Sequence, residues 1–218
     1  MNCAAALPIA AATFVGSHLL MSHPLRRPLV ARLGEKAFGG VYSVVALITF
    51  GLMLYCYWRI GDQAPFWRLG EWAWTAASVL VWFAAILLVG SLRGNPALPG
   101  ARRPKAGPTG VFAITRHPMM WSFAIWAAVH WALIATPKAA ILDGAIIFLA
   151  LVGALGQDRK KAQKLGASWH EWQARTAFVP FTRGAGHPGA LALVGGTILF
   201  LAASWLHPFP VGIWRIVG

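Results

Sequence analysis

The sequence predicts an all-α, polytopic membrane protein with about six transmembrane helices, on three observations. Of its 218 residues, 58% are hydrophobic and only 11% are charged, a composition unusual for a soluble domain of this length. Apolar runs recur at close to the roughly 20 residues that a membrane-crossing helix needs. The basic residues fall in short clusters between these runs. We therefore expect one transmembrane domain covering residues 1–218.

The apolar runs place the predicted transmembrane helices at residues 3–22, 40–60, 71–91, 118–136, 139–157 and 190–206. The first run has no basic residue before it, unlike a signal peptide, so we expect a retained helix. Prolines and glycines alternate through residues 93–116, so no helix crosses that loop unbroken. Pro118 suits the first position of the fourth helix.

The basic residues orient the predicted helices. With both termini outside, the inner loops hold fifteen lysines and arginines and the outer segments hold four. The inner set is Arg26, Arg27, Arg32, Lys36, Arg93, Arg102, Arg103, Lys105, Arg116, Arg159, Lys160, Lys161, Lys164, Arg175 and Arg183. This positive-inside bias predicts a multi-pass protein of a bacterial inner (cytoplasmic) membrane. The net charge of +13 is then a signal of topology and of anionic membrane lipid, and nucleic acid is not a predicted partner.

A polar, basic segment over residues 158–187 follows the fifth predicted helix. Trp169 and Trp172 are three residues apart, which puts both indoles on one face of a short helix. We expect a cytoplasmic interfacial helix between the fifth and sixth transmembrane helices. The alternative is an ordinary solvated linker.

Two histidines differ from the other five. Four of the seven histidines precede a proline and so mark helix boundaries, whereas His18 and His130 lie inside predicted transmembrane helices. A polar ring at such depth is costly unless it has a partner. The partner is either a neighbouring hydroxyl or backbone carbonyl, which makes the histidine a packing device, or a metal. Two neutral imidazoles from different helices commonly hold haem iron in a membrane bundle.

Acidic and thiol chemistry is sparse. Asp143 is the one acid inside a predicted helix, and Lys138 one turn away predicts a local ion pair. The sequence has no paired-carboxylate site, phosphate loop, nucleophile elbow or dinucleotide fingerprint, which argues against a conventional hydrolase or dinucleotide enzyme. Cys3 and Cys56 fall near the outer ends of their helices. A disulfide between them is possible, but buried free thiols are favoured.

Three segments of the chain resemble the NnrU family of multi-pass membrane proteins. They are residues 14–24, which include Gly16-Ser17-His18 and Ser22-His23-Pro24, residues 33–43, and residues 114–130. The resemblance implies a link to nitrite and nitric oxide metabolism, as in denitrification. The family's best-understood relative is the haem b-dependent 15-cis-zeta-carotene isomerase, and that relative's haem ligands correspond to His18 and His130 here. The isomerase carries a cysteine three residues before the second ligand, where this chain has Ala127.

The depth of the two predicted ligands is not obviously equal. At about 1.5 Å per residue, His18 lies about 12 Å from Arg26 and His130 about 21 Å from Arg116. A shared iron therefore requires helix tilt, or an Arg116-His117-Pro118 segment that lies in the interface. Otherwise His117 is the better-matched partner for His18. Arg116 and His117 are also expected near the haem propionates, because a guanidinium pairs well with a carboxylate.

A second resemblance supports a different function. Arg116-His117-Pro118, with Trp169-His170-Glu171-Trp172 and Val179-Pro180-Phe181, resembles the isoprenylcysteine carboxyl methyltransferase superfamily. This resemblance implies a membrane methyltransferase that binds S-adenosylmethionine at the cytoplasmic face. The superfamily usually has a Glu-Glu pair where this chain has Gln157-Asp158-Arg159.

Three functions thus remain open at the level of the sequence. The first is a haem b protein of nitrogen-oxide metabolism or an isomerase of a lipophilic polyene such as zeta-carotene, and the second is the methyltransferase. The third is a non-enzymatic accessory protein for a reductase, in which the histidines only pack. The expected partners are membrane lipid, a lipophilic substrate, and a second copy of the chain or a reductase.

Overall fold

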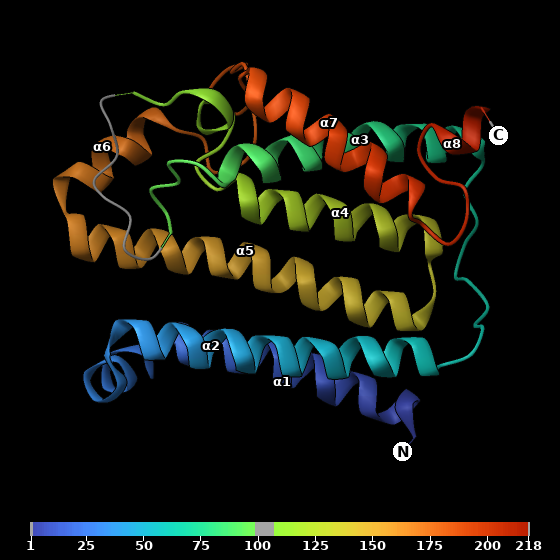
Figure 1. Cartoon of the computed structure of the whole chain (residues 1–218), viewed down its shortest axis with the longest axis horizontal. Helices are drawn as coiled ribbons and strands as arrows, with labels where there is room; N and C mark the ends of the chain where they lie inside the picture. The colour runs from blue at the N-terminus through green and yellow to red at the C-terminus, as the bar shows by residue number, and fades with distance from the viewer. Residues whose placement is uncertain (1, 99–106, 218) are drawn as a thin grey trace. The chain divides into compact units, whose positions relative to one another are not determined.

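The computed structural model describes residues 2–98 and 107–217, and helices are the regular elements of these residues (Figure 1). The helices are α1 (Cys3–Ser22), α2 (Arg26–Arg59), α3 (Glu71–Ser91), the 3-10 helix η1 (Gly110–Ala113), α4 (Pro118–Ile134), α5 (Pro137–Leu165), α6 (Ala167–Arg175), α7 (Ala190–Trp205) and α8 (Trp214–Val217). The predicted all-α class is confirmed. The predicted loop residues Pro99, Arg102, Arg103, Pro104 and Lys105 lie outside the described residues.

The apolar helices fit a membrane-embedded protein. Helices α1, α2, α3 and α5 are long and apolar enough to cross a membrane. Helices α4 and α7, with 17 and 16 residues, are apolar but shorter than the roughly 20 residues of a full crossing. Helices α1 and α3 have the predicted bounds. The protein is therefore a multi-pass membrane protein by its helices, and the six crossings and the side of each terminus remain predictions.

Two helices are longer than the sequence predicts, and in both the extension is polar. Helix α2 begins at Arg26, and Gly34, with φ 78° and ψ 160°, divides it into a short basic helix and a long apolar one. A positive φ is accessible to glycine at little cost, which explains the kink at this residue. Helix α5 continues to Leu165 through lysines, alanine and glutamine, which are good helix formers. We predicted loops in both places because charge marks the end of a membrane span, not the end of a helix.

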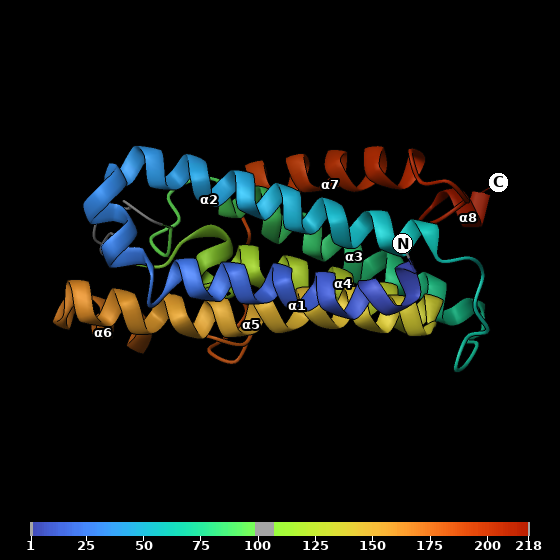
Figure 2. The same cartoon turned by 90° about the horizontal axis from the view of Figure 1, so that it is seen from below.

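The chain divides into two compact units. Unit 1 comprises residues 1–68 and 130–149, and unit 2 comprises residues 69–129 and 150–218. In unit 1, α1 and α2 run side by side in both views (Figures 1 and 2). Their buried side chains form one core with the first turns of α5, including Leu7, Phe14 and Met53 from the hairpin and Leu142 from α5.

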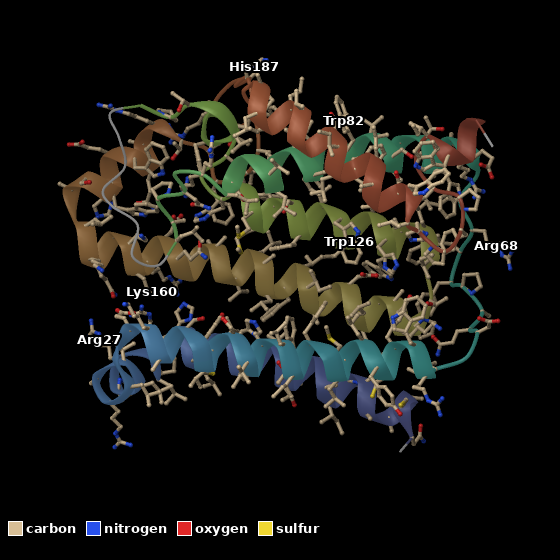
Figure 3. All side chains as sticks on the ribbon, in the orientation of Figure 1. Arg27, Arg68, Trp82, Trp126, Lys160 and His187 are labelled. Atoms are coloured by element: carbon tan, nitrogen blue, oxygen red, sulfur yellow. The ribbon has the colours of Figure 1, made fainter. Side chains whose placement is uncertain are left out.

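Close packing of α3 on α7 organises unit 2. A Cβ atom built on Gly196 of α7 would lie 2.5 Å from the Cα of Ile86 in α3, so only glycine permits this approach. The indole of Trp82, labelled in Figure 3, donates a 2.9 Å hydrogen bond to Thr197 Oγ1 across the same interface. Small residues at a helix crossing are typical of membrane proteins, where backbone approach replaces the hydrophobic effect as the source of affinity.

We predict that Gly196→Ala lowers the free energy of unfolding by about 1–3 kcal/mol, because the added methyl group overpacks the α3–α7 contact. The matched control is Gly153→Ala in α5, where an added Cβ meets no atom within 4 Å. That control is expected to be neutral or slightly stabilising, since alanine favours a helix more than glycine does. Unfolding of the detergent-solubilised variants measures both, and equal shifts would contradict the packing argument.

Candidate functional site

A fully buried carboxylate holds His130 in the last turn of α4. Asp143 of α5 has 0% of its side chain exposed, and its Oδ2 lies 2.8 Å from His130 Nδ1. Because the carboxylate accepts, the imidazole donates from Nδ1, so a neutral His130 ring has its lone pair on Nε2. We call these two residues the Asp143 pair. Such a carboxylate on the second ring nitrogen is the usual support of a metal-ligating histidine.

An aromatic ring and a lysine border the Asp143 pair within unit 1. The ring of Tyr57 lies 6.4 Å from that of His130, centroid to centroid. Lys138 Nζ lies 5.1 Å from the centre of the Tyr57 ring and donates to the carbonyls of Ile60 and Gly61 at 2.9 and 3.2 Å. The lysine therefore caps the end of α2. The predicted ion pair between Lys138 and Asp143 is wrong: the aspartate pairs with the histidine across the α4–α5 hairpin instead.

The second predicted ligand, His18, lies on α1 against α2. Its Nδ1 donates to the carbonyl of Phe14 at 2.8 Å, and its ring lies 5.3 Å from that of Tyr42. Tyr42 in turn shares a hydrogen bond of 3.3 Å with Ser22. A backbone carbonyl can only accept, so His18 also has its lone pair on Nε2. In its neutral form, each of the two histidines therefore has the tautomer of a metal-ligating histidine that binds through Nε2.

The structure does not bring His18 and His130 together. Each ring lies against a tyrosine of the same regular helix, and the two tyrosines, Tyr42 and Tyr57, are 15 residues apart, a rise of about 22 Å. Subtraction of the two ring-to-ring distances from this rise leaves a separation of at least about 10 Å between the imidazoles. Two axial nitrogens on one iron would lie about 4 Å apart. One haem bound by both residues does not fit this arrangement.

The other two predicted site residues, Arg116 and His117, meet a second buried carboxylate in unit 2. Arg116 Nε and Nη2 donate to Asp158 Oδ2 at 2.9 and 2.7 Å, and His117 Nε2 lies 2.9 Å from Asp158 Oδ1. We call these three residues the Asp158 cluster. Both carboxylate oxygens are engaged and all three side chains are largely buried. The guanidinium expected near a haem propionate is therefore already paired within the protein.

The segment after α6 fixes the Asp158 cluster in place. Backbone hydrogen bonds join Arg116 N to Ala177 O at 2.8 Å and Phe181 N to Ile114 O at 3.1 Å. The indole of Trp121 donates to Phe178 O at 2.8 Å, and the Phe178 ring lies 5.2 Å from the Arg116 guanidinium. The two segments that the methyltransferase resemblance requires to be close are therefore neighbours.

Helix α6 places its tryptophans in the core of unit 2. Trp169 and Trp172 share one face, as predicted, and that face packs on the protein among side chains such as Val111 and Phe112. The indole nitrogens of both tryptophans, and Nδ1 of His117, are buried and have no hydrogen-bond partner among the described residues. Buried polar atoms without a partner are costly. The two indole N–H groups are donors, whereas His117 Nδ1 is the acceptor nitrogen of a neutral ring whose Nε2 donates to Asp158.

Single histidines, and no larger donor set, are what the described residues offer to a metal. No group of three or more histidine, cysteine, aspartate or glutamate side chains suited to a metal ion occurs within residues 2–98 and 107–217. Haem requires only one or two axial ligands, because the porphyrin supplies the other four. The Asp143 pair fits a haem ligand by its donor chemistry, and His18 fits less fully because a backbone carbonyl supports it in place of a carboxylate.

Comparison with known proteins identifies the family of the chain. The NnrU protein family model matches residues 6–215. The chain belongs to the NnrU family. It is 27% identical over 158 residues to the chloroplastic 15-cis-zeta-carotene isomerase of Arabidopsis thaliana and 24% identical over 156 residues to that of Zea mays. Each alignment covers 68% of this chain and 42% of the relative, so the chain spans less than half the length of these NnrU relatives. No solved structure matches.

What the sequence did not predict is the pairing of the two aspartates, Asp143 and Asp158, with histidines. The usable signal was the antiparallel α4–α5 hairpin, in which a residue near the end of α4 faces one near the start of α5. With the turn at residues 135–136, His130 pairs with Asp143 and His117 pairs with Asp158 in nearly the same register. A search for acids opposite the histidines across this turn would have found both.

We predict that Asp158→Asn lowers the free energy of unfolding by about 3–5 kcal/mol, because it leaves the buried Arg116 cation without its counter-charge. The matched control is Glu35→Gln, which breaks the Arg26–Glu35 pair in which the glutamate side chain is 65% exposed. That exposed pair is expected to be worth less than about 1 kcal/mol. Equal destabilisation of the two variants in detergent would show that the Asp158 cluster is not a structural support.

Proposed function

We propose that this NnrU protein binds haem b in the membrane, with His130 as an axial ligand and Asp143 as its positioning carboxylate. The Asp143 pair is the observation that carries the proposal. A charged side chain in an apolar helix is costly and usually functional. Among the described residues of unit 1, Asp143 is the buried acid, and it supports His130, which the family resemblance aligns, like His18, with a haem ligand of the isomerase.

The proposed reaction is cis–trans isomerisation of a lipophilic polyene, a substrate that enters from the bilayer. The NnrU relatives named as zeta-carotene isomerases support this choice over nitrogen-oxide chemistry, which rests on the earlier association of the family alone. Bound haem would supply a redox-active iron next to the polyene. The protein's own contribution is to hold the imidazole in one tautomer and to keep the site apolar. We place this activity in a bacterial inner membrane.

His18 is not part of this haem site in our proposal. Its ring packs on Tyr42 and lies at least about 10 Å from the His130 ring, so its role is to join α1 to α2. His130 would then be the one side chain that we assign as a ligand of the haem. Ala127, three residues before His130, is fully buried and offers no thiol to the iron. The cysteine that the isomerase carries at this position therefore has no counterpart here.

Absorption spectroscopy of the purified protein tests this proposal. We expect a Soret band that is lost in His130→Ala, retained in His18→Ala, and retained in the exposed control His187→Ala. Asp143→Asn should weaken haem affinity about 10–100-fold, because loss of a supporting carboxylate typically has that effect. A haem-free protein from haem-replete cells, or a His130→Ala variant that retains wild-type affinity, would overturn the proposal.

A methyltransferase is the second candidate function, and the Asp158 cluster is the observation that favours it. Arg116 and His117 lie against Asp158 and the 176–178 segment, beside α6, as a shared S-adenosylmethionine site would require. The unpartnered nitrogens of His117, Trp169 and Trp172 could bind the polar parts of such a ligand. Against it, Asp158 already satisfies the cations that would bind a carboxylate.

Calorimetric titration with S-adenosylmethionine separates the two candidates. If the protein is the haem protein that we propose, no binding is expected at millimolar ligand in the wild type. Binding that Arg116→Ala weakens tenfold or more, in a colourless protein, would favour the methyltransferase. Glu171→Gln on α6 serves as a control for a general effect of charge near the site.

A further inference from the structure

The two cysteines of the chain lie together at one end of unit 1. Cys3 is the first residue of α1 and Cys56 lies in the last turn of α2, and their side chains belong to the same buried core. Both thiols are free, and the two helices that carry them, α1 and α2, pack on each other. Since the chain contains two cysteines in all, 53 positions apart, their meeting in a helix hairpin is a specific juxtaposition.

The surroundings of the pair favour oxidation over permanent burial as thiols. The other end of the α1–α2 hairpin carries Arg26, Arg27 and Arg32, of which Arg27 is labelled in Figure 3. By the positive-inside rule, the basic end faces the cytoplasm and the cysteine end faces outward. Outside the cytoplasm, neighbouring thiols are normally oxidised. Cys3 is 9% exposed and Cys56 is fully buried, so an oxidant reaches Cys3 first.

We propose that Cys3 and Cys56 form an intramolecular disulfide that fastens the first turn of α1 to the last turn of α2. The oxidant is a disulfide-bearing exchange partner of the outer compartment. The Cys3 thiolate attacks a sulfur of that disulfide and releases one thiol. The Cys56 thiolate then attacks the Cys3 sulfur of the mixed disulfide and releases the second thiol. One S–S bond forms in this protein and one is lost from the oxidant, which takes up two electrons and two protons.

The disulfide would fix the part of α2 that borders the Asp143 pair. Cys56 is next in sequence to Tyr57, whose ring neighbours His130, and both belong to the core that includes Leu142 of α5. Cross-linking two residues so far apart in sequence restricts the unfolded chain strongly. We expect reduction to lower the unfolding temperature by roughly 5–10 °C. This inference is independent of haem binding.

Thiol labelling of the full-length protein in acid-quenched membranes tests the inference. After denaturation, a maleimide-polyethylene glycol reagent should leave the wild type unlabelled without reductant and label two thiols after reduction. Cys3→Ser should show one labelled thiol without reductant, because its partner is lost. The intact mass of the wild type should be 2 Da below that of the reduced protein. This measurement uses the wild type alone, so it does not depend on whether a variant folds.

Two labelled thiols in the wild type without reductant would overturn the proposal. A covalent dimer that reductant separates would also overturn it, since the bond would then join two chains. The control for reagent access is the reduced and denatured wild type, in which both thiols must react.

Discussion

The constraint on which this structure depends is that polar groups in apolar helices must be satisfied within the protein. Hydrocarbon offers no hydrogen bonds, so a buried acid without a partner would be very costly. The α4–α5 hairpin meets this requirement with one aspartate opposite each of its two histidines, Asp143 with His130 and Asp158 with His117. The same contacts define the two candidate sites.

The two aspartates support different roles because their environments differ. Asp158 accepts hydrogen bonds from an arginine and a histidine, and backbone bonds to the 177–181 segment lock the cluster, as expected of a structural support. Asp143 serves a single histidine, whose side chain is 23% exposed. A carboxylate on one ring nitrogen is the support that metal-ligating histidines commonly have.

Much of the fold follows from hydropathy, whereas the site does not. The lengths of the apolar runs predict the first and last residues of α1 and α3 correctly, because the bilayer fixes how long a crossing helix must be. Helix α2 was predicted to begin near residue 40 because charge ends a span, but Arg26 onward is helical, with the break at Gly34. The depth of His130 singled it out from sequence. The sequence did not identify Asp143 as its partner, because pairing across a hairpin depends on the register of the two helices. Lys138, which is nearer to Asp143 in the sequence, is a plausible but incorrect partner for it.

The central claim, that Asp143 holds His130 as the ligand of a haem iron, is tested most directly by resonance Raman spectroscopy of the reduced protein. The account predicts an iron–histidine stretching band that is absent in His130→Ala and moves to lower frequency in Asp143→Asn, because the carboxylate strengthens the donor character of the imidazole. A band that is unchanged in Asp143→Asn would contradict the positioning role. A band that persists in His130→Ala would contradict the ligand itself.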